Sequence, residues 1–236
     1  MSKKTFINIL LLTSIFSFSS QASAGLILDT YSTNTATPDN IGGFAMTDFS
    51  LISGTTALVS SVASPVSGVV NFVDSSGNEL LLLQDTLSAA NSSNSSVYTD
   101  NANSLWWENG ESFDYNIYTT QQHWITILLP ENTYAFSFNV GANMGARGWL
   151  QAEAYDGSEI GKTNFSGLGN PKAPGFAVYS DSSCSAIKSI TVEPPFTWGV
   201  GNFSISQNSC SVPEPNILAL FGLGLVGFGL MRRRKN

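Results

Sequence analysis

The central part of the chain alternates apolar and polar residues with the two-residue period of β-strands. Between residues 133 and 140, three aromatic residues and a valine alternate with smaller or polar residues: Tyr134, Phe136, Phe138 and Val140. Residues two apart in a strand project from the same face, so this segment predicts a strand with one aromatic face. No window of a dozen residues between the two ends of the chain has a convincing helical period.

Short turn sequences separate the apolar segments and predict three hairpins. Asp, Asn, Gly and Pro dominate these turns because they tolerate or impose the backbone angles of tight turns. The predicted hairpins are Val66–Val73 with Glu79–Gln84, Gln122–Leu129 with Thr133–Val140, and Gly148–Tyr155 with Glu159–Thr163. Their turns are Asp74–Asn78, Pro130–Asn132 and Asp156–Ser158. Strands with a turn about every 8 to 12 residues predict an all-β fold, an antiparallel β-sandwich.

The beginning of the chain has a different pattern. Lys3 and Lys4 precede an apolar stretch from Phe6 to Phe18, and small residues follow up to Ala24. A basic start, an apolar segment and an Ala-x-Ala site are typical of a secretory signal peptide. We expect signal peptidase to cut between Ala24 and Gly25, with a retained signal anchor as the alternative.

The end of the chain is apolar and then basic. The 15 residues from Ile217 to Met231 carry no charge, and residues 232–235 are Arg-Arg-Arg-Lys. As a helix the apolar run would be about 22 Å long, which is short for a bilayer core of about 30 Å. The basic cluster places the C-terminus in the cytoplasm and the body of the chain on the other side of the membrane.

Pro213, Glu214 and Pro215 lie just before this apolar run. Prolines hold the chain extended, which makes the segment accessible to a processing enzyme. Together with the glycine-containing apolar helix and the terminal arginines, this tail resembles the PEP-CTERM sorting signal of Gram-negative bacteria. The resemblance implies an exosortase as partner, removal of the tail, and a link to exopolysaccharide. An ordinary C-terminal membrane anchor is the alternative.

The chain therefore divides into a signal peptide (1–24), a β-sandwich domain (25–212) and a sorting tail (213–236). We expect a precursor tethered to the inner membrane by the C-terminal helix, followed by release to the cell surface or the extracellular space. Of the 10 basic residues six lie at the two ends, so the body keeps four against 16 of the 17 acidic residues, a net charge of about −12. Such a body repels phosphate backbones, which argues against nucleic acid as a partner.

The chain has two cysteines, Cys184 and Cys210. An exported protein meets an oxidising compartment, where cysteines pair. If residues 186–193 and 201–207 form a hairpin centred on Thr197, the two cysteines are equally far from the centre and face each other. We therefore predict a disulfide that stabilises the fold by about 3 kcal/mol. Two separate buried thiols are the alternative.

The last two predicted strands, Ile187–Val192 and Trp198–Ile205, resemble the closing strands of galactose-binding-like jelly rolls. Residues 129–157 are similar to the middle hairpins of that family, although Gly201 stands where an aspartate is common. The resemblance implies a jelly-roll body. It implies no particular ligand, because such folds serve binding, adhesive and structural roles alike.

Catalytic signatures are absent from the sequence. His123 is the only histidine, and we expect it to lie in a strand with a structural role. The chain contains no G-x-S-x-G or H-E-x-x-H motif. A glycosidase with paired carboxylates stays open, because 16 acidic residues offer many pairs that a sequence alone does not locate.

Aromatic residues and oxygen-rich turns are the remaining candidates for ligand contact. Sugar binding uses aromatic faces, for which four of the five tryptophans are candidates: Trp106, Trp107, Trp149 and Trp198. Sandwich cores also use tryptophan, so we assign most of them to the core and keep Trp106 and Trp107 as sugar contacts, since adjacent strand residues point to opposite faces. Turn chemistry explains Asp74, Asn78 and Asp156, so we expect no metal or cofactor, with Ca²⁺ at these residues as the alternative.

These observations predict an exported surface or extracellular-matrix protein. We expect a structural or adhesive role without catalysis, with exopolysaccharide as a partner. A carbohydrate-binding module with a defined sugar site is the second hypothesis, and a polysaccharide hydrolase is the third.

Overall fold

A computed structural model describes residues 25–31, 37–51, 57–87, 115–120, 122–142, 146–168, 173–181, 184–193, 198–208 and 210. The regular elements of these residues are all strands. They are β1 (Leu26–Tyr31), β2 (Asn40–Ile41), β3 (Phe44–Ala45), β4 (Thr47–Asp48), β5 (Ala57–Val59), β6 (Ser61–Ala63), β7 (Val69–Val73), β8 (Leu82–Leu87), β9 (Tyr115–Thr120), β10 (Ile125–Leu128), β11 (Ala135–Ala142), β12 (Ala146–Ala154), β13 (Glu159–Leu168), β14 (Gly175–Ser180), β15 (Ile187–Glu193) and β16 (Trp198–Ser206). Within the described residues, no helix has the length and apolar character needed to cross a membrane.

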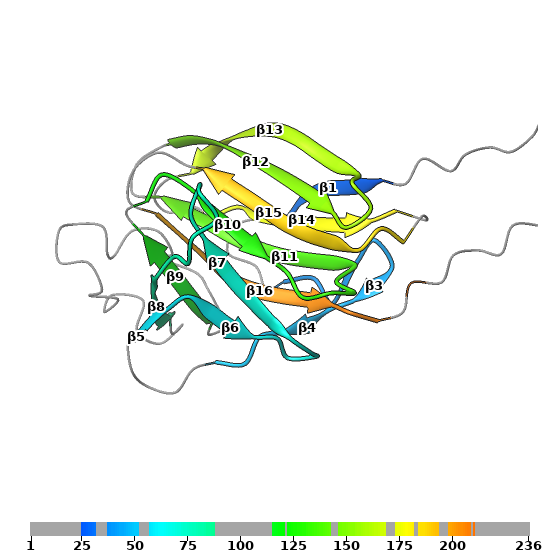
Figure 1. Cartoon of the computed structure of the whole chain (residues 1–236), viewed down its shortest axis with the longest axis horizontal. Coiled ribbons are helices and arrows are strands. Elements are labelled where there is room, and N and C mark those ends of the chain that lie inside the picture. The colour runs from blue at the N-terminus through cyan, green and yellow to red at the C-terminus, as the bar shows by residue number, and fades with distance from the viewer. Residues whose placement is uncertain are drawn as a thin grey trace, which may run out of the picture.

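The strands form two large sheets and one small one. The eight-stranded sheet has the order β1-β14-β11-β16-β9-β8-β5, with β4 also paired to β16. The six-stranded sheet has the order β13-β12-β15-β10-β7-β6, and β2 pairs with β3. Figure 1 shows the two large sheets as two layers, and one core cluster contains side chains from both. The predicted antiparallel β-sandwich is therefore confirmed.

From β9 onward the chain passes repeatedly between the two layers. β9, β11, β14 and β16 lie in the eight-stranded sheet in the order β14-β11-β16-β9. β10, β12, β13 and β15 lie in the six-stranded sheet in the order β13-β12-β15-β10. Two interleaved four-stranded halves of this kind are the strand arrangement of a jelly roll.

Of the three predicted hairpins, one is confirmed and two are wrong. β12 and β13 pair antiparallel around a turn in which Gly157 has a φ of 84°. The turns Asp74–Asn78 and Pro130–Asn132 instead connect the two sheets, since β7 and β10 belong to one sheet and β8 and β11 to the other. Of the first hairpin only a single bridge between Val73 and Glu79 remains. In both cases the strand after the turn joins the other sheet, so its apolar side chains enter the core from the opposite side.

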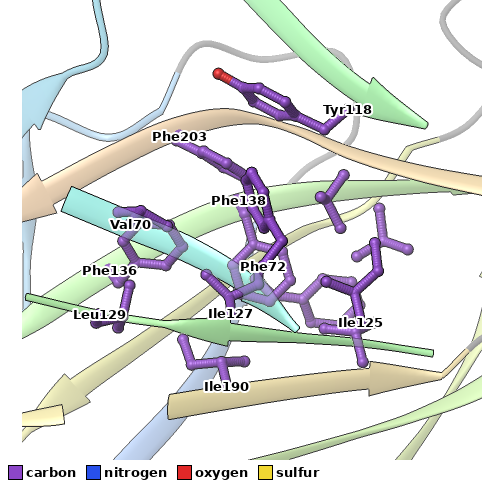
Figure 2. Close-up of a cluster of buried hydrophobic side chains, with 14 of the residues drawn as sticks. Val70, Phe72, Tyr118, Ile125, Ile127, Leu129, Phe136, Phe138, Ile190 and Phe203 are labelled. Carbon is purple, nitrogen blue, oxygen red and sulfur yellow. The ribbon is translucent and has the colours of Figure 1, made fainter. Parts of the chain in front are cut away.

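Phe203 of β16 lies in the core between Tyr118 and the other aromatic rings (Figure 2). Its ring stacks on Tyr118 with the centroids 4.9 Å apart, and it contacts the rings of Phe136 and Phe72 at 5.3 and 6.3 Å. Phe72 comes from the six-stranded sheet and the other rings from the eight-stranded sheet. This aromatic cluster therefore joins the two layers.

Replacing Phe203 by alanine should lower the free energy of unfolding by about 3 to 5 kcal/mol, because the side chain is 4% exposed and its removal leaves a cavity. Urea denaturation followed by fluorescence measures this change. The control is Leu58→Ala, which removes a side chain that is 63% exposed and should cost less than about 0.5 kcal/mol. A similar small loss for Phe203→Ala would contradict the central position of this ring.

Candidate functional site

The two ends of the described body lie at the same end of the sandwich. Leu26 in β1 pairs with Ser180 in β14, and Ala135 in β11 pairs with both Tyr179 in β14 and Ser206 in β16. β1 therefore begins where β16 ends, on the right in Figure 1. We call this the tail-bearing end, because the sequence that follows β16 leads to the predicted sorting tail.

A short series of contacts holds the tail-bearing end together. The Asp181 amide donates a hydrogen bond of 3.1 Å to the carbonyl of Gly25, and the Cys184 amide donates one of 3.3 Å to the carbonyl of Asp181. Cys184 forms a disulfide with Cys210, with the two Cα atoms 5.5 Å apart. Cys184 has a φ of 61°, in the left-handed region that few residues other than glycine adopt. One loop thus connects the residue expected to follow signal cleavage with the last described residue of the body.

The predicted disulfide is confirmed, but the hairpin from which it was inferred is wrong. β15 lies in the six-stranded sheet and β16 in the eight-stranded sheet, so the two strands do not pair. The bridge joins Cys184, three residues before β15 begins in one sheet, to Cys210, four residues after β16 ends in the other. The bond therefore ties the two sheets together.

The turn between β12 and β13 contacts the same loop through Asp156. One carboxylate oxygen accepts hydrogen bonds from the amide and hydroxyl of Ser158 at 2.9 and 2.6 Å, and the other accepts one of 2.6 Å from the hydroxyl of Ser185. These hydrogen bonds, with the Ser158 hydroxyl contributing most, hold the pKa of Asp156 below its ordinary value. Asp156 thereby connects its own turn to the residue that follows Cys184.

The sequence beyond Cys210 follows directly on the tail-bearing end. Residues 211–235 match the family model of the PEP-CTERM protein-sorting motif. The motif implies an exported protein whose precursor is anchored in the membrane and is processed by an exosortase. No curated protein matches the chain. Both the Pro213–Pro215 segment of this motif and the predicted signal peptide lie outside the described residues.

The outer face of the six-stranded sheet carries a hollow of about 410 Å³ over β7, β10, β12, β13 and β15. A β-bulge in β15 shapes its floor. Glu153 pairs with Ser189 whereas Ala154 pairs with Ile187, which leaves Lys188 as the extra residue of the bulge. Lys188 projects outward and its ammonium lies 3.0 Å from a carboxylate oxygen of Glu153. The hollow is therefore lined by charged and polar side chains together with apolar residues such as Leu128 and Ile160.

Two tryptophans border this hollow on the same face of the sheet. The indoles of Trp124 and Trp149 lie with their centroids 6.0 Å apart and their planes inclined at 69°. The ammonium of Lys162 lies 4.0 Å from the centroid of the Trp149 ring. Thr126 and Gln151 line the hollow, and each is two residues from one of the tryptophans, so all four side chains project from one face. We call Trp124 and Trp149 the tryptophan pair.

The structure assigns the predicted tryptophans to different places. Trp198 is fully buried, and its indole N–H donates a hydrogen bond of 2.7 Å to the carbonyl of Gln122. Trp149 is half-buried on the outer face, and Trp106 and Trp107 lie outside the described residues. Sequence reasoning missed Trp124 and Lys162. The alternation of Trp124 with buried Ile125 and Ile127 is the signal that could have placed its indole on the outer face.

The other predicted site residues have local roles. His123 is exposed and lies in a bend, so its predicted place in a strand is wrong, because β10 begins only at Ile125. One oxygen of Asp74 accepts hydrogen bonds from the amides of Ser76 and Asn78 at 2.8 and 2.9 Å. These hydrogen bonds, the Asn78 amide first, hold the pKa of Asp74 below its ordinary value. Across the described ranges, no three His, Cys, Asp or Glu side chains are grouped so as to hold a metal ion.

Removing the disulfide should lower the free energy of unfolding by about 3 kcal/mol, because the bridge closes a loop between residues 26 positions apart. Denaturant unfolding of a variant in which Cys184 and Cys210 are both serine measures the loss. The reduced wild-type protein should show the same loss, which separates the bond from the two substitutions. Two titratable thiols in the unfolded, unreduced wild type would contradict the pairing.

Asp156 should make the fold sensitive to acid. Its pKa is lowered in the folded state, so its stabilising contribution is present above the ordinary value of 3.8 and is lost as the pH falls through the lower folded value. Unfolding measured between about pH 5 and pH 2 should show a smaller decline in stability for Asp156→Asn than for the wild type. Ser185→Ala should reduce the decline in part. An unchanged pH profile in both variants would contradict the role of Asp156.

Proposed function

We propose that this chain is an exported protein of the cell surface or extracellular matrix, with a structural or adhesive, non-catalytic role beside exopolysaccharide. The observation that carries the proposal is the position of the sorting motif. The motif begins one residue after Cys210, where the disulfide has closed the last strand onto the sandwich. The last disulfide-bonded residue of the domain therefore precedes, in the sequence, the segment that an exosortase would process.

Two properties of the body support a role outside the cell. Its disulfide joins the two sheets, and such bonds persist in oxidising compartments. Its net charge of about −12 keeps the domain soluble and opposes attraction to other polyanions. Both properties suit a protein that is exposed to a hydrated extracellular matrix.

Two further functions are each favoured by one observation. A carbohydrate-binding module is favoured by the tryptophan pair beside the hollow. A glycoside hydrolase is favoured by Glu153 and Glu159, which are cross-strand partners and both line the hollow, although Glu153 is paired with Lys188. The hydrolase is tested by measuring the release of reducing ends from the host's own polysaccharide. Release by the wild type that is lost in Glu159→Gln would show a hydrolase and overturn the proposed non-catalytic role.

The exported protein should lack the mass of residues 1–24 and of the residues beyond about Pro215. Intact-mass spectrometry of the protein recovered from the cell surface or medium tests this, because the two cleavages remove both ends of the chain. A variant with alanine at Pro213, Glu214 and Pro215 should stay in the membrane fraction at the higher mass. Asn216→Ala, next to the motif, is the control and should be processed normally. Secreted material that still carries Arg232–Asn236 would overturn the sorting proposal.

A further inference from the structure

The tryptophan pair lies in the part of the body where its positive charge is concentrated. Of the four basic residues of the body, three are on the outer face of the six-stranded sheet: Arg147, Lys162 and Lys188. Arg147 is two residues before Trp149 in β12, and Lys162 covers the Trp149 ring. Within the described part of the chain, Lys188 pairs with Glu153, whereas neither Arg147 nor Lys162 has a carboxylate partner. The face thus presents unpaired hydrogen-bond donors next to two indoles.

The same face also presents acceptors. Glu153 and Glu159 line the hollow, and the Glu193 backbone lies opposite Trp149 in β15. With Asp74, which also lines the hollow, the face carries three cations and four carboxylates, so its net charge is small compared with that of the acidic body as a whole. A face of this composition has no electrostatic preference for a polyanion, and the net charge of about −12 repels one at long range. Its donors and acceptors match a neutral ligand that is rich in hydroxyl groups.

The indole N–H of Trp124 is a second, independent observation. It is shielded from solvent and has no hydrogen-bond partner in the described structure, whereas the N–H of the core residue Trp198 is satisfied by Gln122. Tryptophans that are buried for stability normally have this group paired. Satisfying the Trp124 N–H requires an acceptor that the described chain does not supply.

We infer that the tryptophan pair and the adjoining hollow form a binding site for a segment of a neutral polysaccharide. The apolar C–H face of a pyranose ring packs on the Trp149 indole after the flexible Lys162 side chain moves aside. The neighbouring rings continue into the hollow, whose 410 Å³ lies in the range of small-ligand sites, where Gln151 and Thr126 offer hydrogen bonds. This inference rests on the proposed function, since it names the part of the domain that contacts the matrix.

The location of the site agrees with delivery by the sorting tail. The part of β12 from Trp149 to Ala154 is about 17 Å long at the rise of a strand and runs toward the tail-bearing end. At that end the amide of Tyr155 donates to the carbonyl of Ala186, two residues after Cys184. The tryptophan pair thus lies at the opposite end of the sheet from the tail, on a face that a polymer can approach.

The test is calorimetric titration of the exported, processed protein with neutral hexasaccharides, namely cellohexaose, maltohexaose and mannohexaose, and with hexagalacturonate. At least one neutral hexasaccharide should bind, and hexagalacturonate should bind at least about tenfold more weakly because of the charge of the body. Raising the salt concentration should leave the neutral affinity nearly unchanged, since no counterions are displaced. Equal or stronger binding of the uronate, or no binding by any neutral hexasaccharide, would overturn the inference.

Trp149→Ala should weaken the neutral affinity by about tenfold or more, because it removes the stacking surface. Gln151→Ala, which keeps the tryptophan pair, should weaken it by a few-fold and provides a readout if the first variant does not fold. The matched control is Tyr155→Ala, which removes an aromatic side chain that is 51% exposed at the tail-bearing end and should leave the affinity unchanged. Binding that is lost in Trp107→Ala but kept in Trp149→Ala would place the sugar elsewhere and refute the site.

Retention in the host's matrix separates this inference from the proposed function. If the processed wild type is retained by exopolysaccharide and Trp149→Ala is retained equally, the site is wrong and the proposed function stands. If the wild type is processed but is not retained at all, the proposed matrix role fails as well. If the wild type is retained and Trp149→Ala is not, the result supports both the sugar site and the proposed matrix role.

Discussion

The fold depends on the stacking of two sheets that are each apolar on one face. Ile127 in one sheet and Phe136 in the other are both fully buried, although they approach the core from opposite sides. Neither sheet could leave its apolar face in water, so the chain must supply strands to both layers, and from β9 onward it does so by crossing repeatedly between them. Because the core takes up one face of each sheet, the outer face of the six-stranded sheet is left for polar and aromatic side chains, including the hollow and the tryptophan pair.

The same constraint explains how much of the fold the sequence could predict. Alternation and turn residues are local signals, and they locate the strands and turns around Pro130–Asn132 and Asp156–Ser158 correctly. They do not say which sheet a strand joins, because Phe136 is buried equally well from either side of the core. The Asp156–Ser158 turn holds a true hairpin, since among the described strands β13 lies at the edge of its sheet and pairs with β12 alone. The Pro130–Asn132 turn connects two inner strands, each of which is paired on both sides by more distant segments.

The candidate sites divide in the same way. The sorting motif could be predicted because it is carried by composition and order, and the disulfide because an exported chain with two cysteines pairs them in an oxidising compartment. The tryptophan pair could not be predicted, because Trp124 directly precedes β10 and Trp149 lies in β12. These two strands are separated by β15, and nothing in the sequence sets the order β12-β15-β10. Alternation shows only that each indole is on the side opposite a buried isoleucine or leucine. The two indoles lie close together because of the order of the strands in the sheet.

The disulfide acquires a mechanical meaning from its position between the fold and the tail. A pull on the residues after 210 reaches Cys210 first. Without the bond, that force would pass along β16 alone, between its neighbours β11 and β9 in the eight-stranded sheet. With the bond, part of the force passes through Cys184 into β15, so both sheets share it. The hydrogen bonds of β15 and β16 then bear the force at the same time. Unfolding of the domain under force is slower because more of these contacts must break at once. Under the proposed function, a precursor that is still held by its tail and contacts a polymer at the other end would be under tension, and this bond lies where that tension would enter.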